Sequence, residues 1–156
     1  MGGHSLIRKS LLACLVLLVG LAFTRPAVAQ NVHSATFFGG ALLGSPNGFG
    51  AGAGLGISLT RNVSFEPTFL FGRQGGDGVF TLDGSFLYHF HISDSRLVPY
   101  ILGGVGLAEY DGHTHGSPII GGGIAFPVDD GWQIRPEVRI GTHGLSRFTI
   151  GLTKTF

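Results

Sequence analysis

The 156-residue chain has a single cysteine, Cys14, and only 12% of its residues are charged. Because Cys14 lies in a predicted signal segment, the rest of the chain can form neither disulfides nor thiolate metal sites. Soluble domains are typically about 25% charged, so the low charge content argues against a protein surrounded by water. Beyond residue 29 no apolar run approaches the length of a membrane-spanning helix. If this part lies in a membrane, it must therefore cross as a closed β-barrel.

The first 29 residues have the composition of a cleaved secretory signal peptide. Arg8 and Lys9 supply positive charge, and Ala27 to Ala29 offer small residues for cleavage. The apolar stretch between them, Leu11 to Ala22, has about a dozen residues, whereas a spanning helix needs roughly 20. An N-terminal membrane anchor is therefore the weaker alternative. A lipid-modified Cys14 is not expected either, because the apolar stretch continues past it.

Cleavage after Ala29 is expected to leave residues 30–156 as a single domain with a weakly acidic balance. The whole chain has 10 basic and 9 acidic residues, and three of the basic ones, Arg8, Lys9 and Arg25, belong to the signal peptide. Their removal changes the formal charge from +1 to −2. A protein with this balance has no electrostatic attraction to nucleic acid, so no nucleic-acid partner is expected.

Seven clusters of turn-forming residues divide the remaining chain at regular intervals. They are residues 44–48, 61–62, 75–78, 93–96, 111–116, 129–131 and 141–144. Seven breaks give eight segments of roughly ten residues, the length that a tilted strand needs to cross an outer membrane. The sequence therefore predicts an all-β fold, an eight-stranded antiparallel up-and-down transmembrane β-barrel.

Four segments alternate between bulky apolar residues and small or polar residues, so each has one lipid-facing and one interior face. The residues assigned to the lipid are Val63, Phe65, Pro67, Phe69, Phe71, Phe80, Leu82, Phe86, Tyr88, Phe90, Ile92, Trp132, Ile134, Pro136, Val138, Ile140, Phe148, Ile150, Leu152 and Phe156. Two further segments, 49–59 and 120–128, carry glycine at alternate positions opposite apolar residues. This spacing is typical of a strand, whereas a nucleotide-binding glycine loop needs a strand-loop-helix context.

The faces of the first and fifth segments are ambiguous. In the fifth, Tyr100 and Tyr110 lie ten residues apart, which along a tilted strand spans about 25 Å, the height of an outer-membrane apolar band. We therefore expect both tyrosines to face lipid. The residues placed inside by this choice are Ile101, Val105, Leu107 and Glu109.

The pattern resembles the small outer-membrane β-barrel family, the eight-stranded domains of OmpA and OmpX type. Residues 99–106 (PYILGGVG), 134–139 (IRPEVR) and the last strand carry the resemblance, which covers essentially all of residues 30–156. In that family a C-terminal aromatic preceded by alternating apolar residues is read by the outer-membrane assembly machinery. The residues that match this signal are Phe148, Ile150, Leu152 and Phe156, whereas Lys154 stands where an apolar residue is usual.

The resemblance thus implies a bacterial outer-membrane location, with outer-membrane lipids and the assembly machinery as partners. It is specific for the fold and not for an activity. The loops are shorter than is usual for the family, which argues against an adhesin. A monomer is expected, although the sequence assigns no oligomeric state.

Ionisable residues on the interior faces are expected to pair across the barrel. An eight-stranded barrel is just wide enough for its own side chains to fill, and an arginine facing lipid near the midplane costs about 2–4 kcal/mol. The third and seventh strands lie opposite each other in a ring of eight. The residues predicted to form a cross-lumen ion-pair network that plugs the barrel are Glu66, Asp83, Arg135, Glu137 and Arg139.

The histidines allow two weak metal sites. His89 and His91, two positions apart on one strand face, could chelate zinc or copper. His113, His115 and His143 lie in two predicted surface loops and could meet above the barrel. In both cases ordinary polar lumen or loop residues are the favoured interpretation, and no cofactor is expected.

An enzyme is the alternative class. Certain outer-membrane lipid A deacylases are eight-stranded and use His, Ser and Glu, and this chain offers His143, Ser146 and Glu137. The His–Ser spacing is three residues instead of the two of that family, Glu137 is phased toward the lumen, and no Gly-x-Ser-x-Gly motif occurs. We therefore expect a non-catalytic barrel of structural or surface-interaction type. A narrow gated pore ranks second, and a soluble periplasmic ligand-binding barrel is disfavoured by the low charge content.

Overall fold

The computed structural model describes residues 32–110, 113–142 and 146–156, with Tyr110 described by its backbone alone. The predicted signal peptide and its cleavage site lie outside these residues. The described residues form eight strands, β1 Val32–Leu43, β2 Gly48–Ser58, β3 Val63–Gln74, β4 Asp77–His89, β5 Val98–Tyr110, β6 His113–Pro127, β7 Trp132–Gly141 and β8 Ser146–Thr155. They include no helix with the length and hydrophobicity that crossing a membrane requires.

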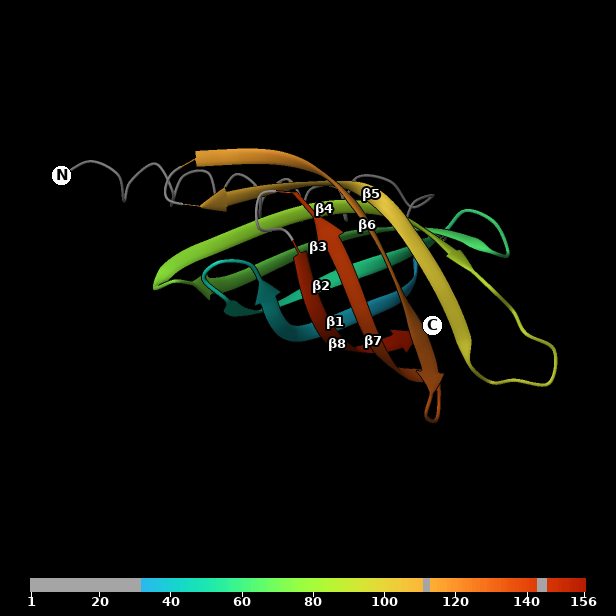
Figure 1. Ribbon diagram of the computed structural model, residues 1–156. Helices are drawn as coiled ribbons and strands as arrows, with labels where there is room; N and C mark the ends of the chain where they lie inside the picture. The colour runs from blue at the N-terminus through green and yellow to red at the C-terminus, as the bar shows by residue number, and fades with distance from the viewer. Residues whose placement is uncertain (1–31, 111–112, 143–145) are drawn as a thin grey trace. The chain divides into compact units, whose positions relative to one another are not determined.

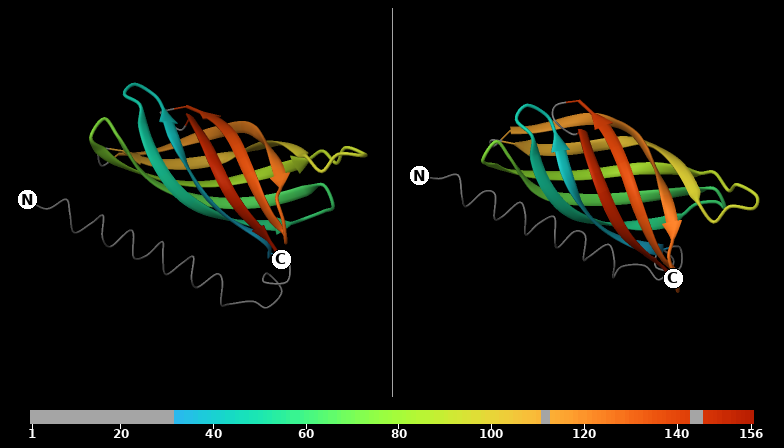
Figure 2. Two further views of the ribbon diagram at one scale, coloured as in Figure 1. Left: turned by 90° about the horizontal axis from the view of Figure 1, so that it is seen from below. Right: turned by 60° about the horizontal axis from the view of Figure 1, so that its bottom comes forward.

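Each strand pairs with its neighbours in the sequence, and β8 returns to pair antiparallel with β1, so the sheet is a closed barrel (Figure 1). The predicted fold class, an eight-stranded antiparallel up-and-down barrel, is confirmed. This topology places the start of β1, the end of β8 and the connections 59–62, 90–97 and 128–131 at one end, which we call the terminal end. The connections 44–47 and 75–76 lie at the opposite end (Figure 2).

The hairpin between β3 and β4 shows why the sequence turns where it does. Gly75 and Gly76 are the two residues between the strands, and both have positive φ angles, 64° and 100°. Two-residue hairpin turns of the primed type require such angles because they match the right-handed twist of the flanking strands. Only glycine adopts them without steric cost, so this pair marks the turn.

The outer surface of the barrel is apolar on every strand. Phe37, Phe49, Val105 and Ile120 are each about two-thirds exposed, between 65% and 70%. The outward assignment of β3, β4, β7 and β8 is confirmed, except that Phe90 and Ile92 lie beyond the end of β4 in the connection to β5. Aromatic rings pair across neighbouring strands on this surface, as in Phe65–Phe86 and Phe71–Phe80, with ring centroids 5.2 and 4.8 Å apart.

The expectation for the fifth strand is wrong. Tyr100 points into the barrel and is 2% exposed, whereas Ile101, Val105 and Leu107 are 50% to 69% exposed on the outer surface. Glu109 has the same outward phase and is partly buried, near the end of the barrel opposite the terminal end. The side chain of Tyr110 lies outside the described part, so its predicted orientation is not tested.

The physical reason for the β5 phase is packing on its inner face. The Tyr100 hydroxyl finds a buried partner inside, while a Cβ on Gly106 would meet Asp83 and Ile119 at 2.4 and 2.6 Å. Gly106, and with it Gly104 and Ala108 on the same face, must therefore face the crowded lumen. Ile101, Val105 and Leu107 then face outward. The spacing of Tyr100 and Tyr110 along the strand does not outweigh this packing requirement.

Candidate functional site: the barrel interior

The candidate site is a cluster of ionised side chains that crosses the lumen at mid-height. Arg135 contacts Glu66 at 2.7 Å and Glu137 at 3.3 Å, and Arg139 contacts the same two carboxylates at 3.0 and 2.5 Å. These four residues form a closed ring in which positive and negative groups alternate. All four come from β3 and β7, which lie opposite each other in the barrel.

Two further residues, Asp83 and Arg147, extend this ring of four to six. The Asp83 carboxylate lies 3.6 Å from Arg139 and also pairs with Arg147 of β8. We call Glu66, Asp83, Arg135, Glu137, Arg139 and Arg147 the ion-pair network. It contains three arginines and three carboxylates and is therefore neutral. Neutrality matters because an uncompensated charge in a buried site is costly.

The structure thus brings together all five residues proposed from the sequence and adds Arg147. The signal for Arg147 was present, because it shares the inner phase of Thr149 and Thr153 on β8. Its side chain is 2% exposed. Alternation alone does not reveal that the partner of Arg147 is Asp83 of β4, on the opposite side of the barrel from β8.

Neutral hydrogen-bonding groups complete the site. The Tyr100 hydroxyl donates to Glu137 at 2.8 Å, and its ring lies 4.8 Å from the Arg135 guanidinium carbon. The Thr68 hydroxyl donates to Asp83 at 3.2 Å. Arg135 donates to the hydroxyl of Thr36, also at 3.2 Å. These contacts add hydrogen bonds that the ion pairs do not supply, while Asp83 Oδ1 and Arg147 Nε stay without a hydrogen-bond partner among the described residues. No pattern in the sequence points to Tyr100.

Glycines on the facing strands make the room that the network occupies. A Cβ on Gly54 would lie 2.7 Å from Thr68 Cγ2 and 3.5 Å from Glu66 Cγ. A Cβ on Gly123 would lie 2.5 Å from the Tyr100 hydroxyl. At these two positions the missing side chains of β2 and β6 are explained by residues of the neighbouring strands β3 and β5 that fill the lumen, and not by a ligand loop.

Apolar side chains pack inside the barrel between the network and the opposite end. Leu42, Leu70 and Val79 form a buried cluster, with Phe38 packed against it. The Arg147 guanidinium carbon lies 5.5 Å from the centre of the Phe38 ring, so this cluster directly adjoins the network. We call these four residues the apolar cluster.

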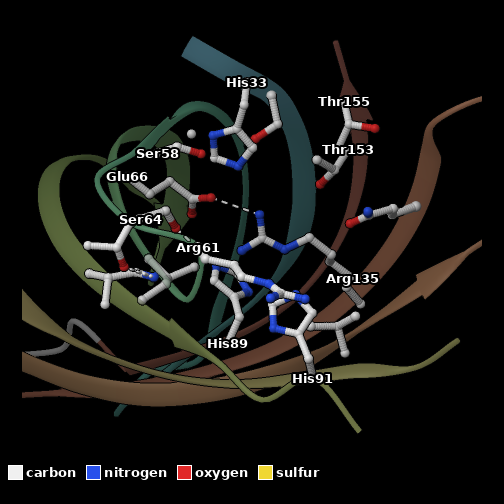
Figure 3. Close-up of a pocket in the computed structure, with 18 residues that line it drawn as sticks. His33, Ser58, Arg61, Ser64, Glu66, His89, His91, Arg135, Thr153 and Thr155 are labelled. Atoms are coloured by element: carbon white, nitrogen blue, oxygen red, sulfur yellow. Dashed lines mark hydrogen bonds and ion pairs between the residues drawn. The ribbon is translucent and has the colours of Figure 1, made fainter. Parts of the chain in front are cut away.

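On the other side of the network, a cavity of 230 Å³ lies at the terminal end (Figure 3). Glu66 and Arg135 line it from the network, and His33, His89 and His91 line it from three different segments. His89 Nε2 lies 3.0 Å from the Ser64 hydroxyl. His91 is exposed and lies beyond the end of β4, so it does not share a strand face with His89 as expected.

The proposed metal ligands do not gather into a larger cluster in the described part of the chain. No group of three or more His, Cys, Asp or Glu side chains there is arranged to hold a metal. His113 and His115 are exposed, with ring centroids 6.4 Å apart, but they belong to the start of β6 and not to a surface loop as expected, because their backbone pairs with Tyr110 and Ala108 of β5. His143 lies outside the described residues, so a loop site that includes it stays a prediction.

Of the three residues considered for a lipid A deacylase, His143 lies outside the described residues, and the other two, Glu137 and Ser146, do not contact each other in the described structure. Glu137 is inside the lumen, where it accepts from Arg135, Arg139 and Tyr100. Ser146 donates to the Gly141 carbonyl at 3.2 Å, as a strand-end hydroxyl does. A base that is held by two arginines cannot activate a nucleophile on the outer surface.

The last strand presents its apolar residues outward. Phe148, Ile150, Leu152 and Phe156 are 42% to 80% exposed. Lys154, the departure from the family pattern, lies at the terminal end, where its ammonium nitrogen is 5.3 Å from the centre of the Trp132 ring and donates to the Asp130 carbonyl. A lysine at a rim can keep its charge in a polar setting in this way.

Solved structures match this barrel at low sequence identity. The N-terminal β-barrel domain of Pseudomonas aeruginosa OprF aligns with a TM-score of 0.65 and 14% identity, over 80% of this chain and 98% of that one. Neisserial surface protein A gives 0.59 and 15%, over 79% and 95%. The Yersinia pestis outer membrane protein Ail gives 0.53 and 14%, over 80% and 99%.

Comparisons with family models and with curated proteins found no match. Identities near 15% carry a shared fold and do not transfer an activity. The likeness covers nearly the whole length of each solved barrel. The chain therefore has the fold of the small eight-stranded outer-membrane β-barrels, as the resemblance drawn from its sequence implied.

Proposed function

We propose that this protein is an integral outer-membrane β-barrel of structural or surface-interaction type, without catalysis and without a wide pore. The observation that carries the proposal is the neutral ion-pair network across the lumen, backed by the apolar cluster on one side. An eight-stranded barrel has room for its own side chains and little else. Lumen side chains that pair with each other leave no continuous water path for a solute.

The location in the outer membrane is supported by the outer surface. Apolar side chains are exposed on all eight strands, whereas a soluble monomer rarely exposes a contiguous apolar patch above a few hundred Å². In this proposal the signal peptide is cleaved after Ala29 and the terminal end faces the periplasm. The assembly machinery reads the last strand, and the barrel works as a monomer among outer-membrane lipids.

Cell fractionation and electrophoresis test the location. The protein should sediment with outer membranes, and it should migrate differently before and after boiling, because intact barrels resist unfolding by detergent. Recovery of the processed chain as a stable monomer in buffer without detergent would overturn the membrane assignment. N-terminal sequencing of the mature protein tests cleavage, with Gln30 as the expected first residue.

Conductance in planar bilayers tests the closed lumen. The unmodified protein should give no large, steady channel. A narrow gated pore is the second candidate, and one observation favours it: Glu66 and Arg135 line the terminal cavity, so water from that end reaches the network. In that case brief small steps should occur, and they should become more frequent when Glu66 and Arg135 are both replaced by neutral residues.

A further inference from the structure

The cavity at the terminal end, which we call the terminal cavity, is not explained by a closed lumen alone. It lies between the network and the terminal end, and its volume of 230 Å³ exceeds what a few waters need. Its innermost side chains are Glu66 and Arg135, and Arg61, from the connection between β2 and β3, extends into it (Figure 3). Since the network and the apolar cluster lie beyond its inner wall, a solute can enter from the terminal end alone.

The charge available in this cavity is positive. Both oxygens of Glu66, the only carboxylate among the lining residues, are engaged by Arg135 and Arg139. Arg61, by contrast, forms no ion pair with any residue in the described part of the chain. A concave site lined by one sign of charge concentrates ligands of the other sign.

Hydrogen-bond donors surround the same space. The His33 imidazole lines the cavity from β1. His91, the Ser58 hydroxyl and the Gln133 amide also line the cavity. Guanidinium, imidazole and hydroxyl groups together are the donors that proteins use for phosphate and carboxylate oxygens.

The alternatives fit less well. A metal ion would need converging ligands, and no group of three is arranged for it in the described residues. A drug-sized ligand occupies a pocket of about 300–1,000 Å³, so the cavity of 230 Å³ suits a smaller molecule.

We propose that the terminal cavity binds a small soluble oxyanion, with Arg61 and His91 at its rim as the principal contacts and His33 on its wall.

Titration of the full chain with inorganic phosphate tests this proposal. The protein is held in a phosphate-free, uncharged detergent at low ionic strength, and binding is followed by calorimetry and by 31P line broadening. We expect saturable binding to one site, weakened about tenfold or more by Arg61→Gln, because a charge-assisted contact is lost. Arg73→Gln is the matched control, since Arg73 is also exposed but lies at the opposite end, and it should leave the affinity within about twofold.

His91→Gln provides a second variant, which should also weaken binding, and all variants should keep the gel mobility of the folded barrel. Three results would each overturn the proposal. The first is the absence of saturable phosphate binding to the unmodified protein. The second is equal weakening by Arg61→Gln and Arg73→Gln, which would mean a diffuse surface effect. The third is binding of an anionic lipid headgroup in mixed micelles without binding of free phosphate.

Discussion

Arg139 on β7 and Glu66 on β3 approach each other across the lumen to 3.0 Å, although their strands stand on opposite walls of the barrel. They are 1% and 3% exposed. Arg139 also contacts Glu137 and Asp83, so it is the one arginine of the network that reaches all three carboxylates. This residue joins the ring of four to the Asp83–Arg147 pair, and the stability of the barrel should depend on it most.

Replacing Arg139 by methionine should therefore destabilise the folded barrel by about 3–5 kcal/mol, the usual effect of removing one partner of a buried ion pair. Three carboxylates would then share two arginines. Urea unfolding in lipid vesicles, followed by the fluorescence of Trp132, measures the change. Arg73→Met, on the exposed part of β3, is the control and should change stability by less than about 0.5 kcal/mol. Similar losses in both variants would refute a central role for Arg139.

A second prediction separates charge balance from the number of contacts. Arg135→Met alone leaves Glu66 and Glu137 with fewer cations. The double variant Arg135→Met with Glu66→Gln removes more contacts but restores two arginines against two carboxylates. Because an uncompensated buried charge costs more than a lost neutralised pair, the double variant should unfold at higher urea than the single one. Equal midpoints would contradict this account.

Tyr100→Phe tests the neutral part of the site. The phenylalanine ring keeps the packing against Arg135, whereas the hydroxyl's hydrogen bond to Glu137 and the one it accepts from Arg135 Nε are lost. Leaving a buried carboxylate with one donor fewer should cost about 1–3 kcal/mol. The same urea assay measures this loss. Tyr88→Phe, on the outer surface of β4, serves as the control for removal of a tyrosine hydroxyl and should have little effect.

Two glycines of β5 allow a test of which face is inside. A Cβ on Gly106 would meet Asp83 Oδ1 at 2.4 Å, whereas a Cβ on Gly103 has no atom within 4 Å. Gly106→Ala should therefore lower the yield of folded barrel and its stability by about 1–3 kcal/mol, the usual cost of overpacking. Gly103→Ala should be neutral or slightly stabilising. The reverse order of the two variants would mean that the strand has the opposite phase. Unboiled gel mobility and urea unfolding provide the two measurements.

How far the sequence predicts this protein differs from strand to strand. Alternation with period two assigns the faces of β3, β4, β7 and β8 correctly, because successive side chains of a strand point to opposite sides whatever the neighbours are. The same rule places Glu66, Asp83 and the three charged residues of β7 in the lumen. For β5 the rule does not decide, since apolar residues occupy both faces, and packing around Gly106 does.

Local patterns are enough to predict the number of strands, the position of most turns and the inward side of Glu66, Asp83 and the charged residues of β7, since these follow from local geometry and from the cost of placing charge in lipid. The closed barrel is needed to see that Asp83 pairs with Arg147, that Tyr100 contacts Glu137, and that a cavity remains at the terminal end. Partners across a lumen depend on the register of all the intervening strands and on closure of the ring. No pattern within a single strand contains that information.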